Sequence, residues 1–417
     1  MEKDLIEFKE ETMDEKRERF NKRIILHCDV NNFFASVECI SRPELKDKPV
    51  AVSGNPETRT GIILAKNELA KKFGVKTGDA IFEAKQKCPN LICLPPHHSL
   101  YEKISKQIID IYYDYTDTVE SFGIDECWLD VTGSTNLLGS GKEIANKIRK
   151  RVLDEIGVTI SVGVSFSKLF AKLGSDYKKP YATTEISKEN FKEIVYPLPV
   201  DSVIGIGRKS LQKLEKMNIS TLGDYVKLPD SELKLKFGIN GILLKQKLLG
   251  YDFDEVVDNN KRPEVKSVGN GTTTIVDISS REEIFSLIQF LSEKISKRLE
   301  EKNLAGRTIH ISIKTSDFKR FGRSESTFEF LQTQDIISKH AISLLDTFWD
   351  YNTNVRAVRI SVSNLEHLDS PSQISFFEKP KSNIEKTVNE IKRKYGKKAI
   401  ELGSVLKSEF INLDKDD

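Results

Sequence analysis

Two short segments of the chain carry carboxylates at the ends of apolar runs. Residues 24–38 read IILHCDVNNFFASVE, in which Asp29 ends a strand-like stretch. Residues 120–130 read ESFGIDECWLD, which places Asp125 and Glu126 side by side. Three carboxylates brought together from distant parts of a chain repel one another unless cations neutralise them, and a pair of Mg²⁺ ions on a phosphate chain is the usual solution. The two segments therefore predict metal-assisted phosphoryl chemistry.

An adjacent Asp-Glu pair is more often a solvated turn, because these residue types are rarely buried. The flanking residues favour the other interpretation here. Large apolar side chains surround the pair, namely Phe122, Ile124, Cys127, Trp128 and Leu129. The two acids are therefore expected in or beside a core.

In combination, the two segments resemble the catalytic motifs of the Y-family, or translesion, DNA polymerases. The resemblance runs from about residue 23 to about residue 380 and is closest to the branch that contains DNA polymerase IV and the catalytic subunit of DNA polymerase V. It implies an error-prone DNA-directed DNA polymerase. Such a nucleotidyltransferase adds deoxynucleotides to a primer 3′-hydroxyl in DNA repair, in the bypass of DNA damage and in the SOS response.

The resemblance also implies a role for each residue of the two segments. Asp29, Asp125 and Glu126 hold two Mg²⁺ ions, and the carbonyl of Val30 helps. Asp29 and Asp125 bridge both ions, and Glu126 favours the ion at the primer. One ion lowers the pKa of the primer hydroxyl while the other holds the triphosphate, so no residue has to become covalently modified. The ring of Phe34 is a steric gate that leaves no room for a 2′-oxygen.

Contacts to the incoming nucleotide follow from the same resemblance. Phe33 and Phe34 lie beside the nucleotide. Lys71, in the motif that ends KFGV, and Lys179, in DYKKP, fall where the family has basic residues that reach the triphosphate.

One position departs from the family pattern. Glu68 stands where relatives of polymerase IV have a tyrosine on the triphosphate, and it is not taken as a ligand. This difference indicates the polymerase V side of the branch. Lys66 or Arg59 is the alternative phosphate contact.

A second motif predicts a contact to DNA. In residues 197–255, Gly205 and Gly207 flank one apolar residue, and the basic pair Arg208-Lys209 follows. Such a turn bares backbone N–H groups at a helix N-terminus, where a phosphate can be bound without reading a base. A plain turn is the alternative, since a lone GxG is a weak signal. The helical patterns on both sides favour a helix-hairpin-helix, which is the thumb of the family that the chain resembles.

Net charge is only +2, so overall basicity does not indicate nucleic acid. Residues 294–323, however, hold nine Lys or Arg against three Asp or Glu. A patch of this kind can neutralise phosphates, with Lys314, Arg320 and Arg323 as the expected DNA contacts. The alternative is an ordinary solvated helix face followed by a loop.

Hydrophobic periodicity predicts an α+β protein of several domains. The resemblance implies a palm with an antiparallel sheet and helices on one face, small fingers, a helical thumb and an α/β little finger. The expected ranges are 1–22 for a charged extension, 23–44 with 97–190 for the palm, 45–96 for the fingers, 191–255 for the thumb, 256–265 for a linker, 266–365 for the little finger and 366–417 for a tail.

Individual elements follow from the same patterns. In the part before the linker, strands are expected at 24–29 and 159–165, an acidic hairpin at 120–130, and helices at 65–75, 101–115, 142–157 and 168–180. After the linker, strands at 309–315 and 356–363 alternate apolar and polar residues, and helices near 281–302 and 335–349 would cover the apolar face. The polar face would then be free to straddle DNA.

The tail contains a short segment with a glutamine, a spacer and two apolar residues: Gln373, Ile374, Ser375, Phe376 and Phe377. It resembles the peptide by which bacterial polymerases dock on the sliding clamp, although the family peptide usually has Leu before Phe. A packed tail is the alternative interpretation.

The resemblance implies a cytoplasmic monomer that works on primer-template DNA and deoxynucleoside triphosphates, and the composition agrees with a soluble, multi-domain intracellular enzyme. A length of 417 residues suggests about two to four domains. No apolar run approaches the ~20 residues of a membrane helix, and the charged N-terminus is no secretory signal. The cysteines form no CxxC pair, which favours reduced buried thiols over disulfides or a zinc site: Cys28, Cys39, Cys88, Cys93 and Cys127.

Two other functions were weighed against a polymerase. A nucleotidyl cyclase uses a similar palm and two metals, but it needs no thumb, linker, DNA-straddling domain or clamp peptide. A non-catalytic DNA-binding repair protein could be built on the hairpin motif, but the intact trio of acids argues against it.

Overall fold

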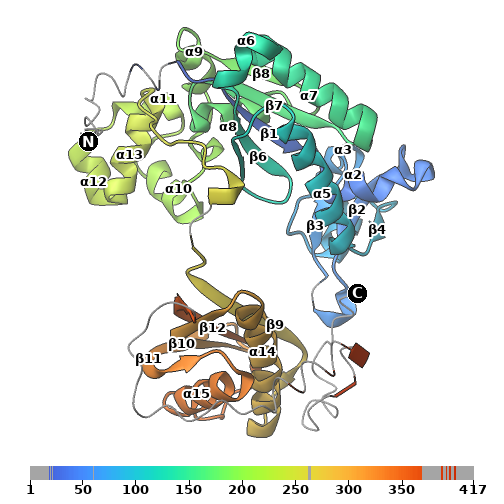
Figure 1. The fold of residues 1–417 in the computed structure, drawn as a ribbon, viewed down its shortest axis with the longest axis vertical. Coiled ribbons are helices and arrows are strands. Elements are labelled where there is room, and N and C mark those ends of the chain that lie inside the picture. Colours follow the sequence, from blue (N-terminus) through green and yellow to red (C-terminus); the bar gives the residue numbers. More distant parts are fainter. Residues whose placement is uncertain are drawn as a thin grey trace, which may run out of the picture. The chain divides into compact units, whose positions relative to one another are not determined.

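The structure, a computed structural model, describes residues 22–368 except 60, 262 and 263, together with the isolated positions 18, 20, 387, 391, 394, 395, 399 and 400. The chain divides into two compact units (Figure 1). The first unit combines Met1–Gly54 with Ile62–Arg262, and the second combines Asn55–Gly61 with Pro263–Asp417. Each unit is described separately.

A five-stranded sheet forms the centre of the first unit, with the strand order β5-β6-β1-β7-β8. Its neighbours are antiparallel, as predicted, except at one edge, where β7 and β8 run parallel. The exception arises because α8 connects these two strands, and such a crossover returns the chain in the same direction. The strands are β1 (Ile25–Val30), β5 (Val119–Ser121), β6 (Glu126–Asp130), β7 (Ile160–Ser165) and β8 (Thr183–Ile186).

Helices cover both faces of this sheet, so the prediction of helices on one face was wrong. One face, with Leu26 and Cys28, packs with buried residues of α5 (His98–Tyr113) and α7 (Gly141–Ile156). The opposite face of β1 meets α8 (Lys168–Tyr177), where Ile25 clusters with Ala171. All six residues of β1 are buried. A strand that is buried on both faces has a nearly continuous apolar sequence without alternation. Periodicity therefore did not indicate that helices cover the second face.

Close packing of α8 depends on one glycine. A Cβ atom added to Gly163 of β7 would lie 1.8 Å from the carbonyl oxygen of Ala171. Real atoms never approach so closely, so a side chain at this position would push α8 away from the sheet. The position of α8 determines where two lysines lie, because this helix and the residues that follow it bring them to the acidic end of β1.

A three-stranded sheet lies in residues 50–94, with the order β3-β2-β4. Around it are α2 (Phe33–Ile40), η1 (Pro43–Leu45), α3 (Glu68–Lys72) and α4 (Ile81–Lys87), and its strands are β2 (Val50–Ser53), β3 (Ile63–Lys66) and β4 (Ile92–Leu94). The helix expected at 65–75 was too long, since its first residues belong to β3. The side chain of Asn67 ends the strand and caps α3 by accepting from the N–H of Ala70 at 3.0 Å.

Residues 191–248 form a helical cluster whose core continues into α8 through Phe170 and Leu173, and in which Leu214, Leu222, Leu233 and Leu248 are fully buried. Its elements are α9 (Phe191–Val195), η4 (Val200–Ser202), α10 (Arg208–Glu215), α11 (Leu222–Lys227), α12 (Asp230–Phe237) and α13 (Ile239–Leu248). Short elements of the first unit also include η3 (Thr132–Ser134), α6 (Thr135–Leu138) and η5 (Asn259–Lys261).

Much of the predicted linker is bound to the first unit. The N–H of Val257 donates to Glu120 at 2.7 Å, and the hydroxyl of Tyr113 donates to Asp258 at 3.0 Å. These contacts tie residues up to about 261 to the acidic hairpin. The boundaries expected for palm, fingers, thumb and little finger stay predictions.

The second unit contains a four-stranded antiparallel sheet, with the order β11-β10-β12-β9, and two helices. Its elements are η2 (Pro56–Thr58), β9 (Ser267–Ile278), α14 (Arg281–Glu301), β10 (Leu304–Thr315), β11 (Arg320–Leu331), α15 (Gln334–Asp346) and β12 (Val355–His367). The two strands and two helices expected from the alternation are present. Strands β9 and β11 were missed, because their many polar and exposed residues obscure the alternation.

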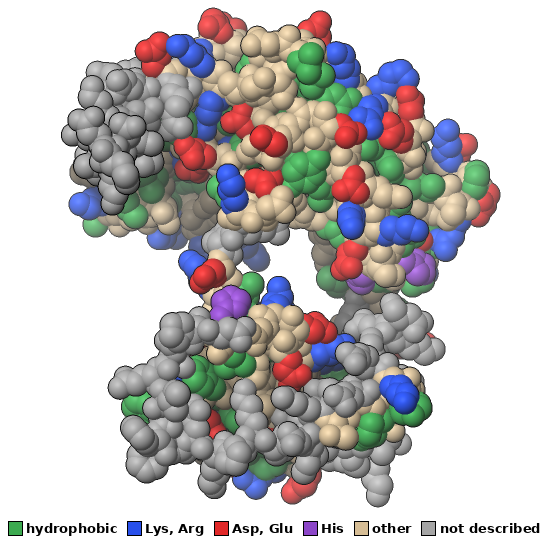
Figure 2. Space-filling view, in the orientation of Figure 1, with side chains coloured by type: hydrophobic (Ala, Val, Ile, Leu, Met, Phe, Trp, Pro, Cys, Tyr) green, Lys and Arg blue, Asp and Glu red, His purple; other side chains and the backbone are tan. Residues whose placement is uncertain are grey.

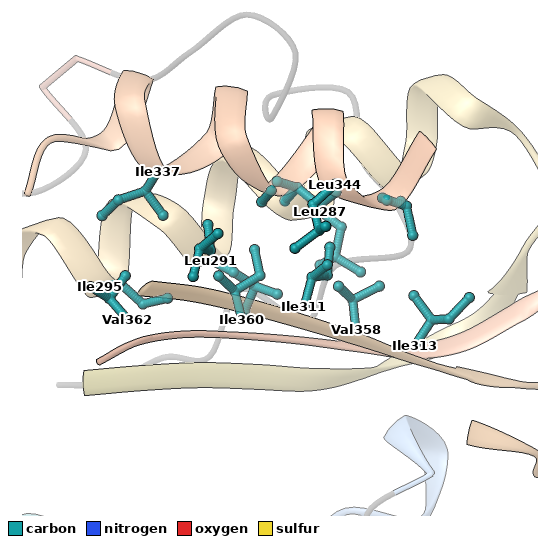
Figure 3. Close-up of a cluster of buried hydrophobic side chains, with 14 of the residues drawn as sticks. Leu287, Leu291, Ile295, Ile311, Ile313, Ile337, Leu344, Val358, Ile360 and Val362 are labelled. Carbon is teal, nitrogen blue, oxygen red and sulfur yellow. The ribbon is translucent and has the colours of Figure 1, made fainter. Parts of the chain in front are cut away.

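Alternation in the central strands builds the core of this unit. Figure 3 shows side chains of both helices and of the strands pointing toward one another between the two layers, for example Leu291, Ile337 and Ile360. Ile309, Ile311 and Ile313 of β10 are buried, and the residues between them are half-buried on the other face. This agrees with the predicted half-buried strands.

Two further observations concern the described part of the chain. No helix there is long and apolar enough to cross a membrane. The five cysteines are free thiols, of which Cys28, Cys88 and Cys127 are buried. Figure 2 shows basic and acidic side chains interspersed over the visible face of the first unit, in agreement with the small net charge.

Candidate active site

Strand pairing brings the acids of the two segments together. In the register of β1 with β6, Asp29 lies directly opposite Glu126. The N–H of Val30 donates to the carbonyl oxygen of Asp125 at 3.0 Å, which fixes the start of β6 beside the end of β1. The three carboxylate residues predicted from the sequence therefore meet at one end of the central sheet.

Burial makes the negative charge at this end costly. Asp29 is only 5 % exposed, and burial raises its pKa to about 7. Lys179 opposes this rise, since its Nζ lies 2.6 Å from Asp29 Oδ2, whereas the facing Glu126 adds to it. The pKa of Asp125 is raised as well, first by burial and then by the charge of Glu126. One lysine is thus not enough to balance the acids.

A second lysine, which the sequence analysis missed, holds the third acid. Lys172 Nζ lies 2.6 Å from Glu126 Oε2. Burial alone would raise the pKa of Glu126, but the contacts with His27 and Lys172 hold it below its usual value. Lys172 lies on α8 seven positions before Lys179. Because α8 ends at Tyr177, Lys179 lies beyond the helix, and helical spacing alone could not have linked the two lysines.

His27 is the other group that the sequence analysis passed over. It is fully buried, its Nδ1 lies 2.8 Å from Ser175 Oγ, and its Nε2 has no hydrogen-bond partner among the described residues. The Oγ of Ser175 donates to the carbonyl of Lys172 at 2.8 Å, so it accepts from His27. His27 thereby ties β1 to α8 beneath the acids, and burial lowers its pKa to about 4.

The donor chemistry of the acidic end fits hard divalent cations, which prefer carboxylate and carbonyl oxygens. Among the described residues, no three His, Cys, Asp or Glu side chains stand close enough together to hold a metal ion. Lys172 and Lys179 engage oxygens of Glu126 and Asp29 instead. A cation bound at these oxygens would have to displace the two ammonium groups.

Two phenylalanines follow β1 in different environments. The turn between them and Asp29 includes Asn32, whose φ of 53° is left-handed. Phe33 is buried in the core of the first unit, so its ring is less accessible than a direct contact with the nucleotide would require. Phe34 is only partly buried, and its ring stacks on Tyr101 with centroids 4.2 Å apart and planes 13° apart.

The basic residues expected at the triphosphate are spread over several places. Lys71 is 54 % exposed on its side chain and lies 3.6 Å from Glu68, which also accepts from Asn32 at 3.2 Å. Lys66 donates to Thr77 at 3.1 Å, and Arg59 forms an ion pair with Asp277 in the second unit. Of the predicted phosphate contacts, only Lys179 directly touches the acidic end.

The glycine turn has the geometry that its sequence predicted. Gly205 has a φ of +102°, and Gly207 is the N-cap of α10. Arg208 and Lys209 are exposed. Gly205 also lines a cleft of about 740 Å³ within the first unit, together with Lys172. Lys172 also contacts Glu126, but none of the three predicted acids lines the cleft.

Basic side chains lie around a shallow hollow on the sheet of the second unit. The hollow measures about 340 Å³ and is lined by Lys314, Arg320 and Arg359 beside the glycines of β9. Lys314 pairs with Arg320 in the register of β10 with β11. Arg323 is exposed on β11. The expected clamp peptide, from Gln373 to Phe377, lies outside the described residues.

Comparison with known proteins assigns the chain to a family. The impB/mucB/samB family matches residues 28–176, the C-terminal domain of that family matches 265–376, and the IMS family HHH motif matches 188–219. DNA polymerase IV of Acetivibrio thermocellus is 43% identical over 94% of this chain and 99% of that protein. DNA polymerase IV of Clostridium kluyveri is 35% identical over 92% of this chain and 98% of that protein.

A solved structure agrees with this assignment. The Y-family DNA polymerase chimera Dbh-Dpo4(243-245)-Dbh has a TM-score of 0.72 and 26% identity, and the match covers 82% of this chain and 98% of that one. The chain therefore belongs to the Y family of DNA polymerases. It is a translesion enzyme of the DNA polymerase IV type, a DNA-directed DNA polymerase.

Two sequence-based interpretations change with this result. The indication from Glu68 toward polymerase V was wrong, because the chain is similar to DNA polymerase IV over nearly its whole length. A nucleotidyl cyclase and a non-catalytic DNA-binding protein are no longer needed as alternatives. The mixed α+β, multi-domain fold with a helix-hairpin-helix motif and a C-terminal antiparallel sheet is confirmed.

The raised pKa of Asp29 predicts how stability depends on pH without divalent cations. Since its folded-state pKa is about 7 and an unfolded Asp titrates near ~3.9, the native state binds more protons between these values. Stability is thus lost as the pH rises through about 4 to 7. Asp29→Asn should flatten this fall and raise the free energy of unfolding by about 1–2 kcal/mol at pH 8. Lys179 keeps Asp176 as a partner in the variant.

Thermal unfolding in EDTA from pH 4.5 to 8 measures this effect. Asp130→Asn is the matched control, because Asp130 lies at the other end of β6 and accepts from Thr132. The control should keep the wild-type slope. An unchanged slope in Asp29→Asn would show that burial does not shift this carboxyl.

Proposed function

We propose that Asp29, Asp125 and Glu126, with the carbonyl of Val30, hold two Mg²⁺ ions for the addition of a deoxynucleotide to a primer 3′-hydroxyl. The observation that carries the proposal is the pairing of Asp29 with Glu126 across two buried strands. Facing carboxylates of this kind need cations. Bound ions would lower the pKa of the attacking hydroxyl and hold the triphosphate.

The two lysines then have a part in the same step. Lys179 and Lys172 contact Asp29 and Glu126 at 2.6 Å without ions. When ions neutralise the acids, these ammonium groups are free to donate to oxygens of the triphosphate, where negative charge grows on the leaving group. Lys71, which is exposed on α3, is a further phosphate contact in the proposal.

In this proposal Phe34 provides the sugar selectivity, and the buried Phe33 packs behind the gate in the core of the first unit. Phe34 begins α2 only a short turn after Asp29, and its ring is supported by Tyr101. A ring that cannot withdraw excludes a 2′-oxygen by contact repulsion, and a deoxynucleotide lacks that atom.

DNA is assigned to the glycine turn and to the basic hollow. At the turn, N–H groups near Gly205 and Gly207, with Arg208 and Lys209, would bind backbone phosphates. In the second unit, Lys314, Arg320 and Arg323 would neutralise phosphates. The assignment of palm, fingers, thumb, linker and little finger to the expected ranges belongs to the same proposal.

Three further points complete it. The segment from Gln373 to Phe377 docks on the sliding clamp, the enzyme acts as a monomer, and it works in the cytoplasm. The apolar pair Phe376-Phe377 would fill a cleft on the clamp while Gln373 forms hydrogen bonds.

Removing single acids tests the metal assignment. Asp29→Ala, Asp125→Ala and Glu126→Ala should each lower primer extension by about a thousandfold or more, since each removes an oxygen ligand on which several kcal/mol of charge stabilisation depend. Binding of primer-template DNA should stay within about threefold, because phosphate contacts lie elsewhere. Asp130→Asn serves as the control that keeps its activity. Extension near the wild-type rate in Asp125→Ala would refute the assignment.

Replacing the gate tests the sugar assignment. Phe34→Ala should raise the ratio of kcat/KM for ribonucleotides to that for deoxynucleotides by about a hundredfold, or ~2.7 kcal/mol, while deoxynucleotide addition continues. Phe33→Ala is the matched control: it should lower stability, because this ring is buried, and leave the ratio unchanged. The opposite result for the two variants would make Phe33 the gate.

The tail is tested with the clamp present and absent. Replacing Gln373, Phe376 and Phe377 by Ala should weaken clamp-stimulated synthesis and leave clamp-free synthesis unchanged, because a tether only raises the local concentration of the enzyme at the primer. The loss should grow with salt, where phosphate contacts are weakest. Ser375→Ala, a change in the spacer, is the control. Equal stimulation of the triple variant and the wild type at every salt concentration would leave the segment without a docking role.

A further inference from the structure

Glu38 is a buried carboxylate to which none of the steps above assigns a role. It lies on α2, one helical turn after Phe34, and is 2 % exposed. Its Oε1 accepts from the hydroxyl of Tyr101 at 2.6 Å and lies 2.7 Å from Nδ1 of His97. Its Oε2 accepts from the guanidinium of Arg42 at 2.9 Å. A buried charge persists only when its oxygens are paired in this way, so the arrangement is specific.

Tyr101 connects this carboxylate to the gate. Its side chain is fully buried at the start of α5. One face of its ring stacks on Phe34 with a centroid distance of 4.2 Å, and the tilted ring of Phe33 has its centroid 6.1 Å away. His98 meets both Phe34 and Tyr101 edge to face, at 5.9 and 5.8 Å. The rings of Phe34, Tyr101 and His98 therefore form one cluster, with His98 beside the stacked pair.

The contacts form a closed loop. Phe34 and Glu38 project from the same side of α2, because residues four apart lie one above the other. Both contact Tyr101, one at the face of its ring and the other at its hydroxyl. A stacked pair alone permits sliding, since stacking has a broad energy minimum. A short hydrogen bond to a carboxylate is directional and about twice as strong as a neutral one, so it fixes the plane of the ring.

We propose that Glu38 is a positioning residue that sets the sugar selectivity of nucleotide addition. Glu38 accepts a hydrogen bond from the hydroxyl of Tyr101 and so keeps that ring against Phe34. The ring of Phe34 then cannot rotate away from the position of a 2′-oxygen. The inference rests on the proposed gate and names the residue that restricts the rotation of the Phe34 side chain.

Four substitutions separate this role from plain packing. Tyr101→Phe removes only the hydroxyl and keeps the stacked ring. Glu38→Ala removes the carboxylate, whereas Glu38→Gln keeps an oxygen that can accept from Tyr101. Arg42→Ala removes the other partner of the same carboxylate, which lies on its more exposed side and touches neither ring.

The measurement is kcat/KM for a ribonucleotide and for the matching deoxynucleotide on one primer-template, with the full-length protein and Mg²⁺. The ratio of the two should rise about tenfold, or ~1.4 kcal/mol, in Tyr101→Phe and in Glu38→Ala. It should stay within about twofold of the wild type in Glu38→Gln and Arg42→Ala. Because both values come from one preparation, a loss of folded protein cancels in the ratio.

A double variant tests whether the residues act in one chain. In the Phe34→Ala background, Glu38→Ala should add nothing to the ratio, since the ring that it positions is gone. An additive effect would mean that Glu38 acts by another route and would overturn the inference. Tyr101→Phe is nearly isosteric, so it gives a result even if Glu38→Ala folds poorly.

The outcomes also separate this inference from the proposed function. If Phe34→Ala leaves the ratio unchanged, the gate itself is wrong. If Phe34→Ala relaxes selectivity but Tyr101→Phe and Glu38→Ala do not, the gate stands and the role of Glu38 falls. The inference would also be overturned if the ratio rose as much in Arg42→Ala or Glu38→Gln as in Glu38→Ala. The charge of Glu38, and not its hydrogen bond with Tyr101, would then control selectivity.

Discussion

The pairing of β1 with β6 is the constraint on which the rest of the site depends. It places Asp29 opposite Glu126 in a buried sheet, where like charges repel strongly. Two ion pairs offset this repulsion. Both come from one region, because α8 and the residues after it bring Lys172 and Lys179 to within 2.6 Å of the two acids. That approach requires Gly163, whose missing side chain lets α8 lie directly against the sheet. The acids, the lysines and the glycine are thus one arrangement.

The same strand also fixes the place of the gate. After Asp29 the chain turns through Asn32 in a left-handed conformation and begins α2, so Phe34 cannot move far from the acids without breaking the strand. From the other side, α5 supplies Tyr101, and Glu38 links the two helices. The acid Asp29 and the proposed gate therefore lie on one short stretch of backbone, and the ring of the proposed gate packs on α5.

The second unit uses a different physical principle. Its two helices bury one face of the sheet, and the other face stays polar and half-exposed, with Lys314, Arg320 and Arg359 around a shallow hollow. Basic side chains on such a face would attract a partner with a regular array of phosphates, as the proposed function requires. The first unit, in contrast, has a cleft that is bordered by the glycine turn and by Lys172, which contacts Glu126.

The sequence by itself determined the trio of acids, the gate candidate, the glycine turn and the alternating strands of the second unit, because each is a local pattern of residue types. It also led to the family, which the comparisons confirmed. Only the tertiary structure decided which groups face the acids and which carboxylate contacts Tyr101. Lys172, His27 and Glu38 lie on separate elements, and nothing local marks them, since their roles arise from strand register and from the approach of helices. Helices on both faces of the sheet, and polar strands such as β11, escaped prediction for the same reason: periodicity describes one element, whereas burial depends on its neighbours.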